Sequence, residues 1–159
     1  MGGVTLRRFV LYVLPLIAWM LFIFGWSTEV GSAEHTRSTL ERILSSLPIL
    51  RDLPDEQILA IDYGIRKAAH IFEYTVLALF AFRAIRQDRT TFRDVDVWGP
   101  LALGVLYAST DEYHQSFVAS RWPSVGDVMY DTFGVMIGVV ATLWWHARKT
   151  VPQSRPPVQ

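Results

Sequence analysis

The sequence predicts an all-α, polytopic membrane protein with four transmembrane helices in an antiparallel bundle. Two observations carry this prediction. Hydrophobic residues make up 51% of the 159 residues, and four stretches are mainly apolar over a length close to that of a bilayer. A helix needs roughly 20 apolar residues to span, because backbone groups cannot stay unpaired in hydrocarbon. The four stretches are residues 9–26, 67–85, 97–118 and 128–145.

The first stretch carries no charged residue, and Pro15 predicts a kink within it. A secretory signal peptide is the alternative, since Arg7 and Arg8 form a basic region before it and Gly31-Ser32-Ala33 resembles a cleavage site. The apolar run is longer than the usual core of a signal peptide, which favours the membrane span.

Lysine and arginine in the short flanking segments predict the orientation. They occur before the first stretch, between the second and third, and after the fourth, and such residues concentrate on the cytoplasmic side. We therefore expect both termini in the cytoplasm, with residues 27–66 and the turn at 119–126 outside. The basic residues concerned are Arg7, Arg8, Arg83, Arg86, Arg89, Arg93, Arg148 and Lys149.

The outer segment 27–66 has apolar residues at helical spacing, such as Leu40, Ile43 and Leu47, and a second helix start near Pro54. The pattern indicates an amphipathic connector on the membrane surface, with a separate binding module as the alternative. Residues 1–149 are expected to form one membrane domain. The tail 150–159 holds three prolines without apolar periodicity and is predicted to be disordered in the cytoplasm.

Composition excludes some functions. Fifteen basic residues balance fifteen acidic ones, without the basic excess that nucleic-acid binding requires. The chain has no cysteine, which rules out disulfides, thiolate metal sites and cysteine nucleophiles.

Ionisable residues gather where three of the stretches approach the outer side. An ionisable residue at the bilayer centre costs about 2.5 to 3.5 kcal/mol, so each needs a partner or a function. Spacings of three and four residues place several of them on shared helix faces, and Ser124-x-x-Asp127 resembles a capping box. We expect the groups to converge in one layer of the membrane. They are Lys67, His70, Glu73 and Tyr74, then Asp111, Glu112, His114 and Gln115, and finally Arg121, Ser124, Asp127 and Asp131.

This pattern resembles the VanZ family of bacterial membrane proteins. The resemblance rests on Lys67-x-x-His70-x-x-Glu73-Tyr74, on Asp111-Glu112-x-His114-Gln115, and on the residues downstream, Arg121, Ser124, Asp127 and Gly134. The family is named for a member that raises resistance to the glycopeptide teicoplanin. The resemblance implies a four-helix fold in the bacterial cytoplasmic (inner) membrane and a role in the cell envelope, and it implies no particular reaction.

The residue types suggest distinct roles. His70 or His114 suits a general base that Asp111 orients, so these three are the catalytic candidates. Arg121 suits an anion contact, with a salt bridge to Asp127 or Asp131 as the alternative. The substrate-binding candidates are Lys67, Glu73, Tyr74, Glu112, Gln115, Arg121, Ser124, Asp127 and Asp131.

A divalent metal suits the same imidazole and carboxylate groups. A hydrogen-bonded network of histidine, carboxylate and arginine explains the same residues without a metal and is the favoured interpretation, with a bound metal as the alternative. Gly99, Gly104, Gly134 and Gly138 fit close helix packing, and Gly134-x-x-x-Gly138 is a small-residue contact motif.

Three functions fit these observations. The first is a membrane enzyme acting on a lipid-linked or phosphate-bearing envelope substrate. The second is a non-catalytic binder of an envelope lipid, a precursor or an antibiotic. The third is a small proton- or ion-coupled transporter, with His70, Glu73, Asp111 and Asp131 as a relay. Four helices make a thin pathway, so a transporter would need to form a homo-oligomer.

Overall fold

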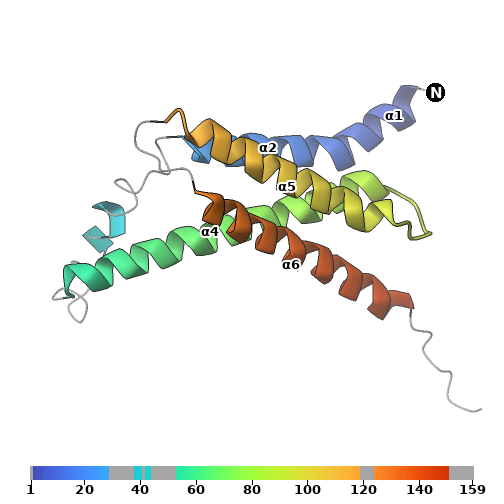
Figure 1. Ribbon diagram of the computed structural model, residues 1–159. Helices are drawn as coiled ribbons and strands as arrows, with labels where there is room; N and C mark the ends of the chain where they lie inside the picture. The colour runs from blue at the N-terminus through green and yellow to red at the C-terminus, as the bar shows by residue number, and fades with distance from the viewer. Residues whose placement is uncertain (1, 29–37, 41, 44–52, 119–123, 151–159) are drawn as a thin grey trace, which may run out of the picture.

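A computed structural model describes residues 2–28, 38–40, 42–43, 53–118 and 124–150. The regular structure of these residues is helical throughout, and the chain reverses direction from each long helix to the next (Figure 1). The predicted all-α bundle is confirmed. Its elements are α1 (Gly2–Arg8), the π-helical turn η1 (Phe9–Val13), α2 (Leu14–Trp26), α4 (Asp55–Arg86), α5 (Val95–Gln115) and α6 (Val125–Thr150).

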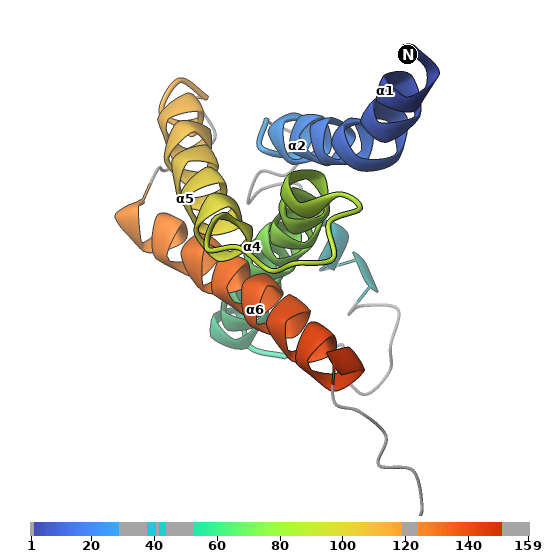
Figure 2. The ribbon, with the colours of Figure 1, turned by 90° about the vertical axis from the view of Figure 1, so that its right-hand side faces the viewer.

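The helical segments α1, η1 and α2 follow one another directly, and the π-helical turn ends two residues before Pro15. Proline lacks an amide hydrogen and its ring crowds the preceding turn, so a helix must adjust there. A single wide π turn is one such adjustment. Figure 2 shows α1 turned away from the axis of α2, at the position where the sequence predicts a kink.

Helix α4 corrects one expectation about the connector. The second helix begins after Pro54 as predicted, but it continues without a break to Arg86 over 32 residues. Residues 55–66 therefore belong to the same helix as the second span and do not form a separate connector helix. The reason is local, because no proline interrupts the helix and Gly64 alone is too weak a breaker. The predicted amphipathic residues 44–52 and the tail 151–159 lie outside the described residues.

The centre of the bundle is the contact between α4 and α6, which pack more extensively than any other two helices that the structure describes. Small residues permit this approach. A Cβ atom on Gly134 would collide with the backbone carbonyl of Ile71, and one on Gly138 would lie 2.6 Å from the carbonyl oxygen of Thr75. The hydroxyl of Thr75 lies 2.9 Å from the carbonyl oxygen of Gly134. The predicted small-residue contact is confirmed.

Helix α5 packs against both α4 and α6, and a Cβ atom on Gly104 would collide with Val135. Helix α2 lies beside α4 and α5 and is tied to both by side chains. The indole nitrogen of Trp19 donates to the carbonyl of Glu73 (2.9 Å), and the hydroxyl of Tyr107 donates to the carbonyl of Met20 (2.5 Å). The interior at mid-bundle is apolar and consists of Leu77, Ala78, Ala81, Ala108, Val135 and Val139.

The distribution of polarity is that of a membrane protein. Large apolar side chains are exposed on every long helix, for example Leu21, Phe72, Leu106 and Met129, whereas the buried residues include carboxylates such as Asp131. Among the described helices, three are long and apolar enough to cross a membrane, in the ranges 5–26, 55–86 and 125–148.

Helix α5 is not one of these three, so the prediction of four apolar spans holds for only three helices. It is long enough, at 21 residues, but Asp96 lies near one end and Asp111 and Glu112 near the other. All three carboxylates are buried between helices. The sequence analysis noted Asp111 and Glu112 but gave more weight to the apolar middle of the stretch than to these charges.

Candidate functional site

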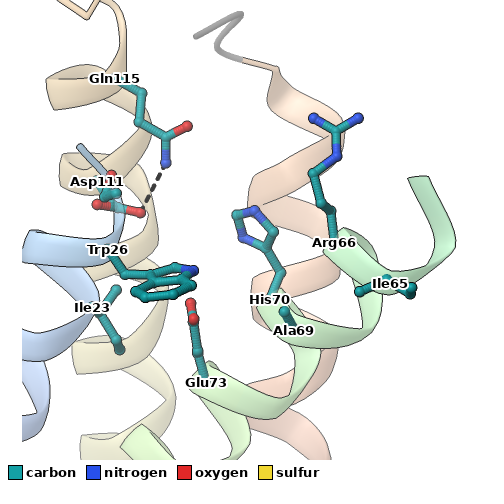
Figure 3. A pocket seen from close by; sticks show the side chains of 10 residues that line it. Ile23, Trp26, Ile65, Arg66, Ala69, His70, Glu73, Asp111 and Gln115 are labelled. Carbon is teal, nitrogen blue, oxygen red and sulfur yellow. Dashed lines mark hydrogen bonds between the residues drawn. The ribbon is translucent and has the colours of Figure 1, made fainter. Parts of the chain in front are cut away.

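A pocket of about 140 Å³ opens at the end of the bundle where α2 ends and α6 begins. Its lining combines one cation, one histidine, two carboxylates and an amide, and these side chains come from α4 and α5 (Figure 3). The last residues of α2 and the residue after it form one side of the pocket. The lining residues are Ile23, Trp26, Ser27, Ile65, Arg66, Ala69, His70, Glu73, Asp111 and Gln115.

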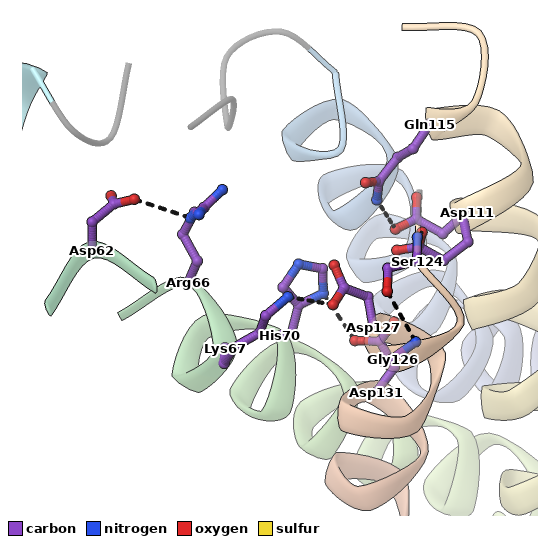
Figure 4. A network of polar contacts seen from close by, with 11 residues as sticks. Asp62, Arg66, Lys67, His70, Asp111, Gln115, Ser124, Gly126, Asp127 and Asp131 are labelled. Atoms are coloured by element: carbon purple, nitrogen blue, oxygen red, sulfur yellow. Dashed lines mark hydrogen bonds and ion pairs between the residues drawn. The ribbon is translucent and has the colours of Figure 1, made fainter. Parts of the chain in front are cut away.

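The pair between His70 and Asp131 is the best-defined polar contact of the pocket. The Nδ1 atom of His70 lies 2.9 Å from a carboxylate oxygen of Asp131 (Figure 4). Asp131 is fully buried, and its other oxygen has no hydrogen-bond partner among the described residues. A carboxylate accepts, so Nδ1 carries the proton and Nε2 is the nitrogen left for a molecule in the pocket. The arrangement is that of an oriented general base.

The opposite wall belongs to α5. The side-chain amide of Gln115 donates to Asp111 over 3.0 Å, and both residues are buried. This bond fixes the Asp111 carboxylate at the rim of the pocket. The carboxylate of Glu73 extends from α4 into the space between the two walls (Figure 3). The pocket therefore has acceptors on one side and an imidazole on the other.

Arg66 supplies the positive charge of the pocket, and the sequence pattern did not single it out. Its Nε atom lies 3.2 Å from Asp62, one turn earlier on α4, and Asp62 is buried. Spacing of four residues permits this pair. Asp62 contacts only the Nε atom, the two terminal nitrogens of the guanidinium point away from Asp62 (Figure 4), and the side chain is 31% exposed.

Lys67 is engaged elsewhere. Its ammonium forms an ion pair with Asp127 at the start of α6 and lies over the rings of Tyr63 (4.9 Å) and Tyr130 (5.4 Å). These contacts join α4 to α6 and leave Arg66 as the cation of the pocket lining. Asp127 was expected to complete a capping box, and its carboxylate instead pairs with Lys67.

Ser124 does cap α6. Its hydroxyl accepts the amide of Gly126 (3.1 Å), and its carbonyl accepts the amide of Asp127 (2.9 Å). A carboxylate oxygen of Glu112, near the end of α5, accepts the amide of Ser124 itself (2.8 Å). The start of α6 therefore has its free amide groups satisfied from two helices, as a helix end requires.

Replacing Glu112 with alanine is expected to destabilise the bundle by about 1 kcal/mol, the usual effect of losing a cap. The substitution removes the acceptor of the Ser124 amide at a buried position. Glu112→Gln keeps an acceptor oxygen and should lose less. Thermal unfolding in detergent measures both variants, with Tyr113→Phe at the exposed neighbouring position as the control. Equal midpoints for Glu112→Ala and wild type would show that the cap contributes nothing.

The remaining site candidates lie apart from the pocket lining. The ring of His114 packs on Phe24 with 4.3 Å between centroids, and its Nδ1 atom is buried without a partner among the described residues. Tyr74 is fully buried deeper in the bundle, with its ring 6.3 Å from that of Tyr107. Arg121 lies outside the described residues, so its expected anion contact stays a prediction.

A comparison with protein-family profiles gives a match to the VanZ/LLP1 family over residues 9–146. The match covers most of the chain and includes every lining residue of the pocket. The chain belongs to the VanZ/LLP1 family. Searches of curated proteins and of solved structures gave no match. The VanZ resemblance noted in the sequence is therefore confirmed at the level of the family.

The structure of this VanZ/LLP1 member bears on the metal hypothesis. Within the described part of the chain, no group of three or more histidine and carboxylate side chains converges closely enough to hold a metal ion. The pair of His70 and Asp131 supplies two donors, fewer than the three protein ligands of a typical catalytic zinc site. The hydrogen bond between His70 and Asp131 accounts for these two groups without a metal.

Two polar pocket residues of this VanZ/LLP1 member were not among the candidates of the sequence analysis. Arg66 and Ser27 lie beyond the ends of the predicted apolar stretches and were counted with the outer segment. Ser27 is buried, lines the pocket, and its hydroxyl has no partner among the described residues. The offset of four residues between Arg66 and His70 was the available indication for the arginine, since it places both on one helix face.

Proposed function

We propose that the protein is an enzyme of the bacterial cytoplasmic membrane that acts on the head group of a lipid-linked, phosphate-bearing envelope substrate. The observation that carries the proposal is the pair of His70 and Asp131 beside a pocket that also holds Arg66. In this scheme His70 is the general base and Asp131 positions it, while Arg66 binds the anionic group. The carboxylates of Glu73 and Asp111 accept hydrogen bonds from hydroxyl or amine groups of the head group. The amide of Gln115 can accept or donate one.

The proposed topology places α5 as a fourth membrane helix and both termini in the cytoplasm. Its support is the distance along α4, since the 20 residues from Arg66 to Arg86 span about 30 Å, the thickness of the hydrocarbon core. The pocket then lies at the outer interface and the arginines at the inner one, in agreement with the concentration of basic residues on the cytoplasmic side. A lipid head group reaches such a pocket from the membrane.

The size of the pocket favours this substrate over the alternatives. At about 140 Å³ it is smaller than the roughly 300 to 1,000 Å³ of sites for whole drug-sized ligands. A small head group fits, whereas a glycopeptide antibiotic does not. A transporter is less well supported, because the interior beyond Tyr74 is apolar as far as the structure describes it, from Leu77 to Ala81 on α4 and from Val135 to Val139 on α6.

Incubation of the purified protein with envelope lipids tests the proposal. In liposomes made from a bacterial lipid extract, wild-type protein is expected to consume a phosphate-bearing lipid and form a new product, detected by mass spectrometry. His70→Gln, with the same fold, is expected to form none. A lipid profile unchanged by wild-type protein would contradict the enzyme and favour a binder.

The same two proteins test the link to teicoplanin. A sensitive bacterium producing the wild-type protein is expected to need a higher teicoplanin concentration for growth inhibition than one producing His70→Gln at an equal level. Equal inhibitory concentrations would remove antibiotic susceptibility from the proposal without affecting the lipid reaction.

A further inference from the structure

Basic residues gather at the end of the bundle opposite the pocket. Arg89 is neutralised by Asp96, with 2.5 Å between the ion-pair atoms, and Asp88 is held by Arg8 (3.4 Å) and by the hydroxyl of Tyr12. Asp96 and Asp88 are therefore already paired with other residues. Arg83 and Arg86 have no carboxylate partner among the described residues, so their charges are left uncompensated.

The guanidinium of Arg86 is nevertheless held in place. It donates to the carbonyls of Arg89 (3.2 Å) and Thr90 (3.1 Å) and lies 5.0 Å from the ring centre of Phe92. The guanidinium of Arg83 lies over the ring of Tyr12 at 6.0 Å. Carbonyls and rings position a cation without cancelling its net charge. Arg83 and Arg86 are therefore positioned cations that keep their net charge, and both line one recess.

An apolar groove leads to these arginines along the face between α4 and α6. Its volume is about 520 Å³, and its floor runs from Val76 to Arg83, over about 10 Å of helix. A recess of about 480 Å³ adjoins it, and its lining includes Arg83, Arg86 and Arg89 together with Asp88, the carboxylate that Arg8 and Tyr12 hold. The two cavities are neighbours, because Phe82, Arg83 and His146 line both of them. The rest of the groove is lined by Leu79, Phe80, Ala141, Thr142 and Trp145.

We propose that the groove and the recess together bind an anionic phospholipid. One acyl chain occupies the groove, and the phosphate lies against Arg83 and Arg86. Guanidinium groups match phosphate oxygens two at a time, and basic pockets between transmembrane helices favour negatively charged head groups. A zwitterionic lipid leaves the second arginine uncompensated, and a soluble phosphate has no chain to fill the groove. This site is separate from the pocket of the proposed enzyme and does not depend on its reaction.

Thermal unfolding of the full-length protein in detergent tests the site. Added phosphatidylglycerol is expected to raise the unfolding midpoint, and phosphatidylcholine with the same acyl chains is expected to have little effect. For the variant Arg83→Gln/Arg86→Gln, the phosphatidylglycerol concentration that gives the half-maximal shift should rise about thirty-fold, because each basic residue near an anionic lipid contributes a roughly fivefold gain in affinity. Arg148→Gln is the matched control, since Arg148 lies 3.6 Å over the Trp144 ring and away from the groove.

A second variant examines the groove without altering charge. Ala141 is exposed on the groove wall, so Ala141→Phe is expected to fold normally and to weaken the effect of phosphatidylglycerol by filling the path of the acyl chain. Glycerol phosphate alone is expected to give no shift. Equal shifts with the two lipids, an unchanged shift in the double variant, or a full shift with glycerol phosphate would each overturn the proposal.

Discussion

The variant Asp131→Asn is expected to lose about 10²- to 10⁴-fold of the lipid conversion rate, the range for the loss of general acid–base catalysis. The two side chains have the same shape, so α6 keeps its contacts with α4. The amide, however, cannot stabilise a protonated imidazole, and its NH₂ group can donate to Nδ1 of His70 and reverse the tautomer. His70 would then present a protonated Nε2 to the pocket and could not accept a proton there.

The rate measurement should separate turnover from binding. Asp131 lies behind His70 and does not line the pocket, so the maximal rate is expected to fall with little change in the substrate concentration at half-maximal rate. Asp94→Asn is the control, because Asp94 is an exposed carboxylate at the other end of the bundle. An Asp131→Asn variant with the wild-type rate would show that Asp131 does not position the base.

The second large effect is expected in stability. Gly134→Ala places a methyl group against the backbone of Ile71, which is unable to move aside as a flexible side chain would. Overpacking of this kind costs about 1 to 3 kcal/mol, and it also separates α6 from α4 at the level where Asp131 meets His70. We expect a lower unfolding midpoint together with reduced activity.

Replacing Gly64 with alanine is expected to raise the stability of the protein, whereas the same change at Gly134 lowers it. A Cβ atom on Gly64 meets nothing within 4 Å, so Gly64→Ala removes only the flexibility of glycine in a helix, a gain of about 0.5 to 1 kcal/mol. Unfolding midpoints measured in one detergent compare the two variants directly. Destabilisation of equal size at both positions would show that helix contact at Gly134 is not the cause.

Patterns of residue spacing predicted the parts of the site that depend on one helix. Offsets of three and four residues placed Lys67 and His70 on one stripe of α4, and Asp111 and Gln115 on one face of α5. The structure has these pairs side by side, and it brings both faces to the same end of the bundle. Local geometry fixes such neighbours before any tertiary contact forms.

The pairing between helices was not predictable in the same way. Asp111 was the residue expected to orient the histidine, but in the structure Asp111 bonds to Gln115 and His70 pairs with Asp131. The close approach of α6 to α4 at Gly134 brings Asp131 to His70. The cation of the pocket also depends on contacts that the sequence does not show. Lys67 pairs with Asp127 on α6, whereas Arg66 pairs with Asp62 on its own helix and lines the pocket. Sequence spacing along one helix contains no information about the rotation of the next helix.

The polar ends of α5 have a consequence for membrane insertion. Asp96 is neutralised by Arg89, which precedes α5 in the chain, but Glu112 bonds to the amide of Ser124, which follows it. Glu112 therefore leaves the ribosome before the residue that becomes its partner does. A nascent chain that ends before Ser124 lacks the group that satisfies Glu112, so α5 settles among its neighbours only when α6 arrives.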